Sequence, residues 1–235
     1  MSDEMKNHGS EKKYGQFHRR VFEANIVNFA VWATIAILIG GIVEIVPMFT
    51  PAGTEISPDV TPYTALEVAG RDIYVSEGCY LCHSQWVRPM RAEILRYGPW
   101  SRAWEYQYDR PFQLGSRRIG PDLHRIGGKY PDAWHYEHMR DPRSTTPGSV
   151  MPPYAWLLTN RIDAGDVRAS MVALKKTGTP YTDEDLAGVE ESLAGQGGEI
   201  VGRLREAGLE SEPDRAIIAV IAYLQRLGMD GRAAL

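Results

Sequence analysis

The sequence predicts a mainly α-helical protein with one N-terminal transmembrane helix followed by a helical domain. The first observation is an apolar run from Ile26 to Val46, whose 21 residues match the length of a helix that crosses a bilayer. The second is the helical spacing of apolar residues at both ends of the remaining chain, in residues 64–75 and 215–227. The third is composition, because 235 residues that are 43% hydrophobic and 24% charged are typical of a globular chain with one core.

The residues around the apolar run predict its orientation. Lys12, Lys13, Arg19 and Arg20 precede it closely, whereas no Lys or Arg occurs between positions 47 and 70. By the positive-inside rule, the N-terminus is cytoplasmic and the rest of the chain is exported. A cleaved signal peptide is the alternative, but the charged region is long and no convincing small-x-small site follows the run. We therefore expect an uncleaved anchor.

The chain is expected to have four parts. They are a cytoplasmic tail, a transmembrane anchor, a linker rich in Pro, Thr and Gly, and an exported domain, at residues 1–24, 25–48, 49–62 and 63–235. Pro47 is expected to stop the anchor helix. Asn28 and Glu44 interrupt its apolar character, and Glu44 either snorkels to the interface, which we favour, or faces a partner helix.

A short motif, Cys79-Tyr80-Leu81-Cys82-His83, predicts one covalently bound haem c. Two thiols at this spacing can each bond one vinyl group of the same porphyrin, and the adjacent His83 then lies beneath the iron as a ligand. A thioredoxin-like pair needs no following histidine and should begin a helix after a strand. A structural zinc site needs four ligands, but Cys79 and Cys82 are the chain's only two cysteines. Covalent haem attachment outside the bacterial cytoplasmic membrane also fits an exported domain.

The two terminal helices of the exported domain are expected to pack against each other. Thr64 is a candidate N-cap with Glu67 in capping-box register. Gly70 costs about 1 kcal/mol relative to Ala inside a helix, so we expect another helix backbone to approach it. A first helix leading into the haem motif and a last helix crossing it resemble a class I cytochrome c, with Tyr74 and Tyr223 at the crossing. The alternative is two amphipathic helices of an unrelated helical domain.

The second axial ligand is predicted to be Met151. Most buried methionines only fill a core, but Met151 lies in the segment 141–153, whose prolines stiffen a loop that can present a thioether to the open face of the haem. The segment resembles the Pro-Gly-x-x-Met-Pro loop of class I cytochromes. His124, His135 or His138 would instead give a lower-potential bis-His iron. Because His135 and His138 lie three positions apart on a predicted helix, a metal pair is conceivable, but we favour a solvated helix face.

Pro121, in the stretch Gly120-Pro121-Asp122-Leu123, is a candidate to support the haem ligand. Its carbonyl is free to accept a hydrogen bond from the His83 ring, which would fix the ring's orientation and strengthen the ligand. Candidate partners of the haem propionates, none of them favoured, are Arg117, Arg118, Arg125 and Trp134.

The motifs together resemble subunit II, the mono-haem cytochrome c subunit, of a cbb3-type cytochrome c oxidase. The matching stretches are 45–47, 62–66, 70–74, 77–79, 82–85, 88–89, 96–98, 120–123, 125–130, 151–152 and 180–182. Cys-His-Ser-Gln followed by Arg-Pro is much more specific than the haem motif alone. Residues 188–214 look longer than the family needs, and the sequence suggests no role for them.

The resemblance implies an electron-transfer subunit rather than a catalytic one. One haem c ligated by His83 and Met151 would pass electrons toward a haem-copper catalytic subunit that reduces oxygen to water, with a di-haem cytochrome c subunit as neighbour. The implied location is the bacterial inner membrane, with the haem domain periplasmic. Alternatives are a free membrane-tethered carrier, the cytochrome c subunit of a nitric oxide reductase, or a structural subunit with a vestigial haem. The net charge of −4 argues against a nucleic-acid partner.

Overall fold

The computed structural model describes residues 19, 22, 25–48, 57–115 and 117–230. The predicted cytoplasmic tail, apart from residues 19 and 22, and residues 49–56 of the predicted linker lie outside the described residues. The chain divides into two compact units, Met1–Met48 and Phe49–Leu235.

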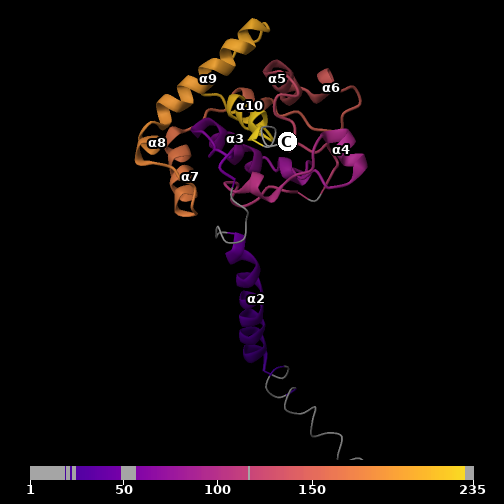
Figure 1. Ribbon diagram of the computed structural model, residues 1–235, viewed down its shortest axis with the longest axis vertical. Coiled ribbons are helices and arrows are strands. Elements are labelled where there is room, and N and C mark those ends of the chain that lie inside the picture. The colour runs from indigo at the N-terminus through magenta and orange to yellow at the C-terminus, as the bar shows by residue number, and fades with distance from the viewer. Residues whose placement is uncertain (1–18, 20–21, 23–24, 49–56, 116, 231–235) are drawn as a thin grey trace, which may run out of the picture. The chain divides into compact units, whose positions relative to one another are not determined.

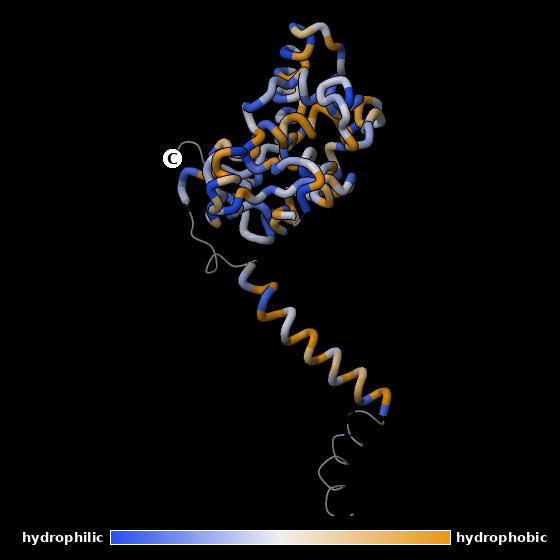
Figure 2. The backbone as a smooth tube through the Cα atoms, turned by 90° about the vertical axis from the view of Figure 1, so that its right-hand side faces the viewer, coloured by the Kyte–Doolittle hydropathy of each residue, from blue (hydrophilic) through white to orange (hydrophobic). Residues whose placement is uncertain are grey.

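The first unit contains one apolar helix, α2 (Ile26–Met48). Figure 2 shows apolar residues along its whole length, and none of its membrane-length window is buried in the protein. Pro47 lies inside the last turn, so the helix ends one residue after the predicted stop. A helix of 23 residues with such a surface is long and apolar enough to cross a bilayer.

The second unit is helical, and the described residues contain no strand beyond one isolated bridge between Arg161 and Arg215. Together with α2, this confirms the predicted fold class. Figure 1 shows α3 and α10 in the middle of the unit, with α4 on one side and α7 to α9 on the other. The elements are α3 (Ala65–Ser76), η3 (Cys79–Leu81), α4 (Arg91–Tyr97), η4 (Ala103–Tyr106), α5 (Asp132–Arg140), α6 (Pro142–Thr145), η5 (Ala155–Leu158), α7 (Ala164–Lys176), α8 (Asp183–Ala187), α9 (Val189–Glu206) and α10 (Ala216–Arg226).

The crossing of α3 and α10 forms the centre of the core. Thr64 caps α3 through the predicted capping box with Glu67. At Gly70 the two backbones meet, because an added Cβ would overlap the carbonyl oxygen of Ala219 and lie 2.8 Å from the Cβ of Tyr223. The Tyr74 and Tyr223 rings pack 5.4 Å apart, centroid to centroid. The expected close approach at Gly70 is therefore confirmed.

Residues 188–214, for which the sequence suggested no role, contribute to the same core. They contain α9, which packs against α3, α5, α7 and α10. Its buried side chains include Val189, Ile200 and Leu204, while most of its charged residues face solvent. Amphipathic spacing makes this segment a covering helix of the domain.

Candidate functional site

The Cys79–His83 motif folds as one tight turn at the end of α3. Gly78 has a φ of 69° and directs the chain from α3 into η3. Within the turn, the amide N–H groups of Cys82 and His83 donate to the carbonyl of Cys79 over 3.1 and 3.0 Å. Both thiols are free, with Cys79 half-buried and Cys82 exposed. The turn therefore presents two thiols and an imidazole together.

The His83 ring is held from one side by the segment that contains Pro121. Its Nδ1–H donates to the Pro121 carbonyl over 2.8 Å, which is the contact expected from the sequence. The backbone of Gly120 lies so close to the ring that an added Cβ would overlap it. Because Nδ1 carries the proton, Nε2 is the nitrogen available to a metal.

The electrostatics of the His83 ring suit a metal ligand. Burial lowers the pKa of His83, while the hydrogen bond to Pro121 and the charge of Asp122 oppose this shift. The ring is therefore kept in the neutral form that binds a metal. A donor set of two thiols and one neutral imidazole, with a glycine against the ring, fits the covalent haem c that the motif predicts.

The environment of Cys79 does not suit a thioredoxin-like pair. Burial, reinforced by the charge of Glu77, raises the pKa of the Cys79 thiol to about 12. A redox-active dithiol requires a lowered thiol pKa, and it normally lies at the start of a helix. Here the thiols follow the end of α3 instead of beginning a helix. No strand precedes them, since the described residues contain only one isolated bridge, between Arg161 and Arg215.

The segment that carries Met151 returns to the haem motif. Met151 is half-buried against the core, in a stretch without regular structure between α6 and η5. Three residues later, burial raises the pKa of Tyr154, and the charges of Cys79 and Cys82 raise it further. The Trp156 indole N–H donates to a Glu77 carboxylate oxygen over 3.0 Å, which ties η5 to the end of α3.

Two of the three histidines considered as alternative ligands have polar partners within the protein, whereas the buried Nε2 atom of His135 has no hydrogen-bond partner among the described residues. The Nε2 atom of His124 lies 2.6 Å from Glu105 Oε2, and the Nδ1 atom of His138 lies 2.6 Å from the Thr145 hydroxyl. The expected solvated helix face is wrong for His135, whose side chain is only 1% exposed. Burial lowers the pKa of His135 to about 4 because α5 packs this ring into the core.

Asp122 was not singled out in the sequence but is the centre of a buried network beside the motif. Its carboxylate accepts hydrogen bonds from the Ser84 hydroxyl over 2.6 Å, the Trp86 amide over 2.7 Å and the His124 amide over 2.9 Å. A guanidinium nitrogen of Arg118 lies 3.5 Å from the same carboxylate. Asp122 follows Pro121 and Ser84 follows His83, so both residues are next to predicted site residues in the sequence. That adjacency does not indicate that their side chains contact each other.

Two of the arginines considered as propionate partners are engaged with carboxylates of this chain. Arg118 pairs with Glu93, and Arg125 pairs with Glu105. Hydrogen bonds from Arg118 and Arg88 lower the pKa of Glu93 to about 2 against the effect of burial. Burial alone would raise the pKa of Glu105, but His124 and Arg125 lower it to about 2.

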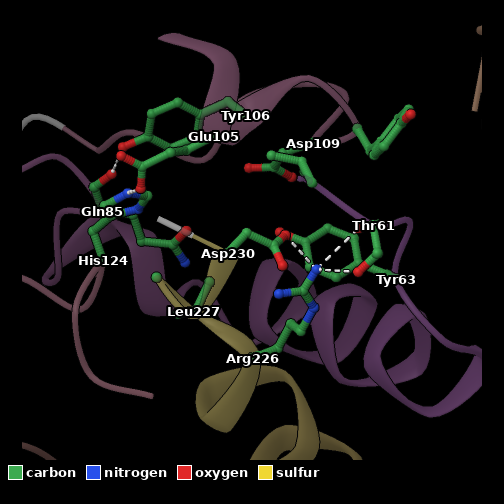
Figure 3. Close-up of a pocket in the computed structure, with 13 residues that line it drawn as sticks. Thr61, Tyr63, Gln85, Glu105, Tyr106, Asp109, His124, Arg226, Leu227 and Asp230 are labelled. Atoms are coloured by element: carbon green, nitrogen blue, oxygen red, sulfur yellow. Dashed lines mark hydrogen bonds and ion pairs between the residues drawn. The ribbon is translucent and has the colours of Figure 1, made fainter. Parts of the chain in front are cut away.

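A small polar pocket lies apart from the predicted haem ligands (Figure 3). It is lined by residues from the two ends and the middle of the domain, including Thr61, Glu105, His124, Arg226 and Asp230, and by none of the five predicted site residues. Arg226 donates to the Thr61 carbonyl over 2.9 Å and pairs with Asp230. The pocket is therefore not part of the predicted haem site.

The comparison with protein families matches almost the whole chain. The model described as cytochrome c oxidase, mono-haem subunit/FixO, matches residues 18–230. No curated protein matches the chain. The match includes the apolar helix, the haem motif, the Met151 segment and residues 188–214, for which the sequence suggested no role and which contain α9.

Proposed function

We propose a function from one premise: the chain belongs to the FixO family, the mono-haem subunits of cbb3-type cytochrome c oxidases. The proposal is that it passes electrons through one covalent haem c toward a haem-copper catalytic subunit that reduces oxygen to water. The observation that carries it is the turn that presents Cys79, Cys82 and His83 together, with the Nδ1 atom of His83 bonded to Pro121.

Each proposed site residue has a distinct task. Cys79 and Cys82 would tether the porphyrin, and His83 would bind the iron through Nε2. Pro121 would hold the His83 ring in position through its carbonyl, 2.8 Å from Nδ1. Met151 would be the second protein ligand of the iron, presented by its proline-rich segment. The haem supplies a one-electron redox couple, and ligation by His and Met raises its potential relative to two histidines.

The membrane arrangement is also part of the proposal. The helix α2 would anchor the chain in the bacterial inner membrane with the N-terminus cytoplasmic, as the basic residues before it indicate. The haem domain would then lie in the periplasm. Its proposed partners are the haem-copper catalytic subunit, the di-haem cytochrome c subunit and the surrounding lipid.

Purification of the native protein in mild detergent tests the proposal. Haem c accompanied by haem b and copper, in a stable complex that consumes oxygen, is the expected result. Haem c without haem b and copper would instead indicate a tethered carrier. A Cys79→Ala chain that retains full turnover would show that the haem is vestigial and would overturn the electron-transfer role.

A variant pair tests the Met151 ligand separately. Met151→Ala should change the haem c spectrum and lower its midpoint potential, because the iron would lose its thioether ligand. Met229→Leu is the matched control, since Met229 is 41% exposed and lies beyond α10. If Met151→Ala leaves both spectrum and potential at the control values, Met151 is not the ligand.

A further inference from the structure

We propose that Asp122 is a positioning and charge-setting residue for the haem site, lowering the haem's midpoint potential through His83. This inference rests on the proposed function, because it requires a haem iron bound to His83. It extends that function by naming a buried carboxylate that acts on the haem through its ligand His83.

Asp122 directly follows Pro121, whose carbonyl accepts the His83 Nδ1–H, so fixing Asp122 also fixes that carbonyl. Its carboxylate oxygen Oδ2 accepts hydrogen bonds from the Ser84 hydroxyl and the Trp86 amide, both just after the motif, over 2.6 and 2.7 Å. Two backbone hydrogen bonds also join the segment of Asp122 to the motif region: the Gly120 N–H donates to the Cys82 carbonyl and the Leu123 N–H donates to the Ser84 carbonyl.

The Asp122 side chain is 0% exposed, so water screens its charge poorly. That charge lies beside the haem ligand, because Asp122 directly follows Pro121, which binds the His83 ring, and its carboxylate accepts from Ser84, the residue after His83. A haem ligated by His83 gains one positive charge when it loses an electron, so the same carboxylate favours the oxidised form.

The neighbouring charges partly offset the effect of Asp122 on the haem midpoint potential. Arg118 lies 3.5 Å from the Asp122 carboxylate and is itself paired with Glu93, which also binds Arg88. Arg118 also donates to the Ser84 hydroxyl over 2.6 Å. The network is therefore a chain of alternating charges in which Asp122 is the member next to the haem ligand.

Redox titration of the haem c band in the purified complex tests the proposal. For Asp122→Asn, the ratio of reduced to oxidised haem at the wild-type midpoint should rise about tenfold, which is about 59 mV for one electron. Asp122→Glu, which restores the charge, should stay within about threefold of wild type. Glu93→Gln is the matched control, because it removes another buried carboxylate of the same network and should change the ratio less than Asp122→Asn.

The outcomes separate charge from packing. An unchanged ratio in Asp122→Asn, or equal shifts in Asp122→Asn and Asp122→Glu, would overturn the proposal. If Asp122→Asn does not assemble, Arg118→Gln provides the second test. This variant removes the cation beside Asp122, so the negative charge of Asp122 is no longer offset. The ratio of reduced to oxidised haem should therefore fall, and a rise would overturn the proposal. A wild-type protein without covalent haem would instead refute the proposed function itself.

Discussion

The region around the haem motif and residues 182–214, which contain α8 and α9, use charged residues in opposite ways. Between residues 78 and 120 there are three acidic residues, and their side chains are almost fully buried against arginines: Glu93, Glu105 and Asp109. Between residues 182 and 214 there are ten acidic residues and two arginines. Those that form ion pairs there do so at the surface, as Glu212 does with Arg161. Acidic residues beside the motif therefore hold specific buried contacts with arginines, whereas those of the other region mainly lie on the surface.

The largest expected effect comes from breaking a buried pair. Glu105→Ala would leave Arg125 and His124 buried without their carboxylate, where the side chains of Glu105 and Arg125 are 4% and 5% exposed. Breaking such a pair costs about 3–5 kcal/mol. Thermal unfolding of the haem-loaded protein in detergent should show a fall in Tm of about 10 °C.

The control for this variant is Glu212→Ala in the other region. The side chains of Glu212 and Arg161 are 53% and 56% exposed, and such surface pairs contribute about 0–1 kcal/mol. Its Tm should stay close to that of the wild type. Equal losses in the two variants would contradict the distinction between the regions.

The next effect concerns two helix glycines. Gly70→Ala forces a Cβ into the carbonyl of Ala219, and overpacking of this kind costs about 1–3 kcal/mol or more. Gly202→Ala on α9 meets no atom within 4 Å and should stabilise the protein by up to about 1 kcal/mol through helix propensity. Denaturant unfolding of both variants measures the change in the free energy of unfolding, which should be negative for Gly70→Ala and positive for Gly202→Ala. An unchanged free energy in Gly70→Ala would contradict the tight crossing of α3 and α10.

A further effect is a dependence of stability on acid pH. Glu93 and Glu105 have an ordinary pKa of 4.5, which the folded protein lowers to about 2. Their contribution to stability is therefore complete above pH 4.5 and is lost as the pH falls through about 2. The free energy of unfolding should decrease less steeply in that range for Glu105→Gln than for wild type, whereas Glu212→Gln should keep the wild-type slope.

Local sequence was enough to predict the elements that depend on short-range chemistry. The apolar run gave α2, the Thr64 and Glu67 spacing gave the capped start of α3, and the position of Gly70 predicted a helix crossing. The haem motif is itself local, because the spacing of Cys79 and Cys82 needs only one turn of chain. These features could be predicted because their partners lie within a few residues or because few residue types satisfy them.

Only the tertiary structure decided which polar residues are buried and what they contact. The burial of His135 depends on the packing of α5, and the contact between Ser84 and Asp122 joins residues 38 positions apart. Amphipathic spacing in α9 was present in the sequence, but its partners α3 and α10 lie at the two ends of the domain. Such contacts follow from the folding of the whole chain, because a sequence pattern indicates that a face is apolar and not which helix covers it.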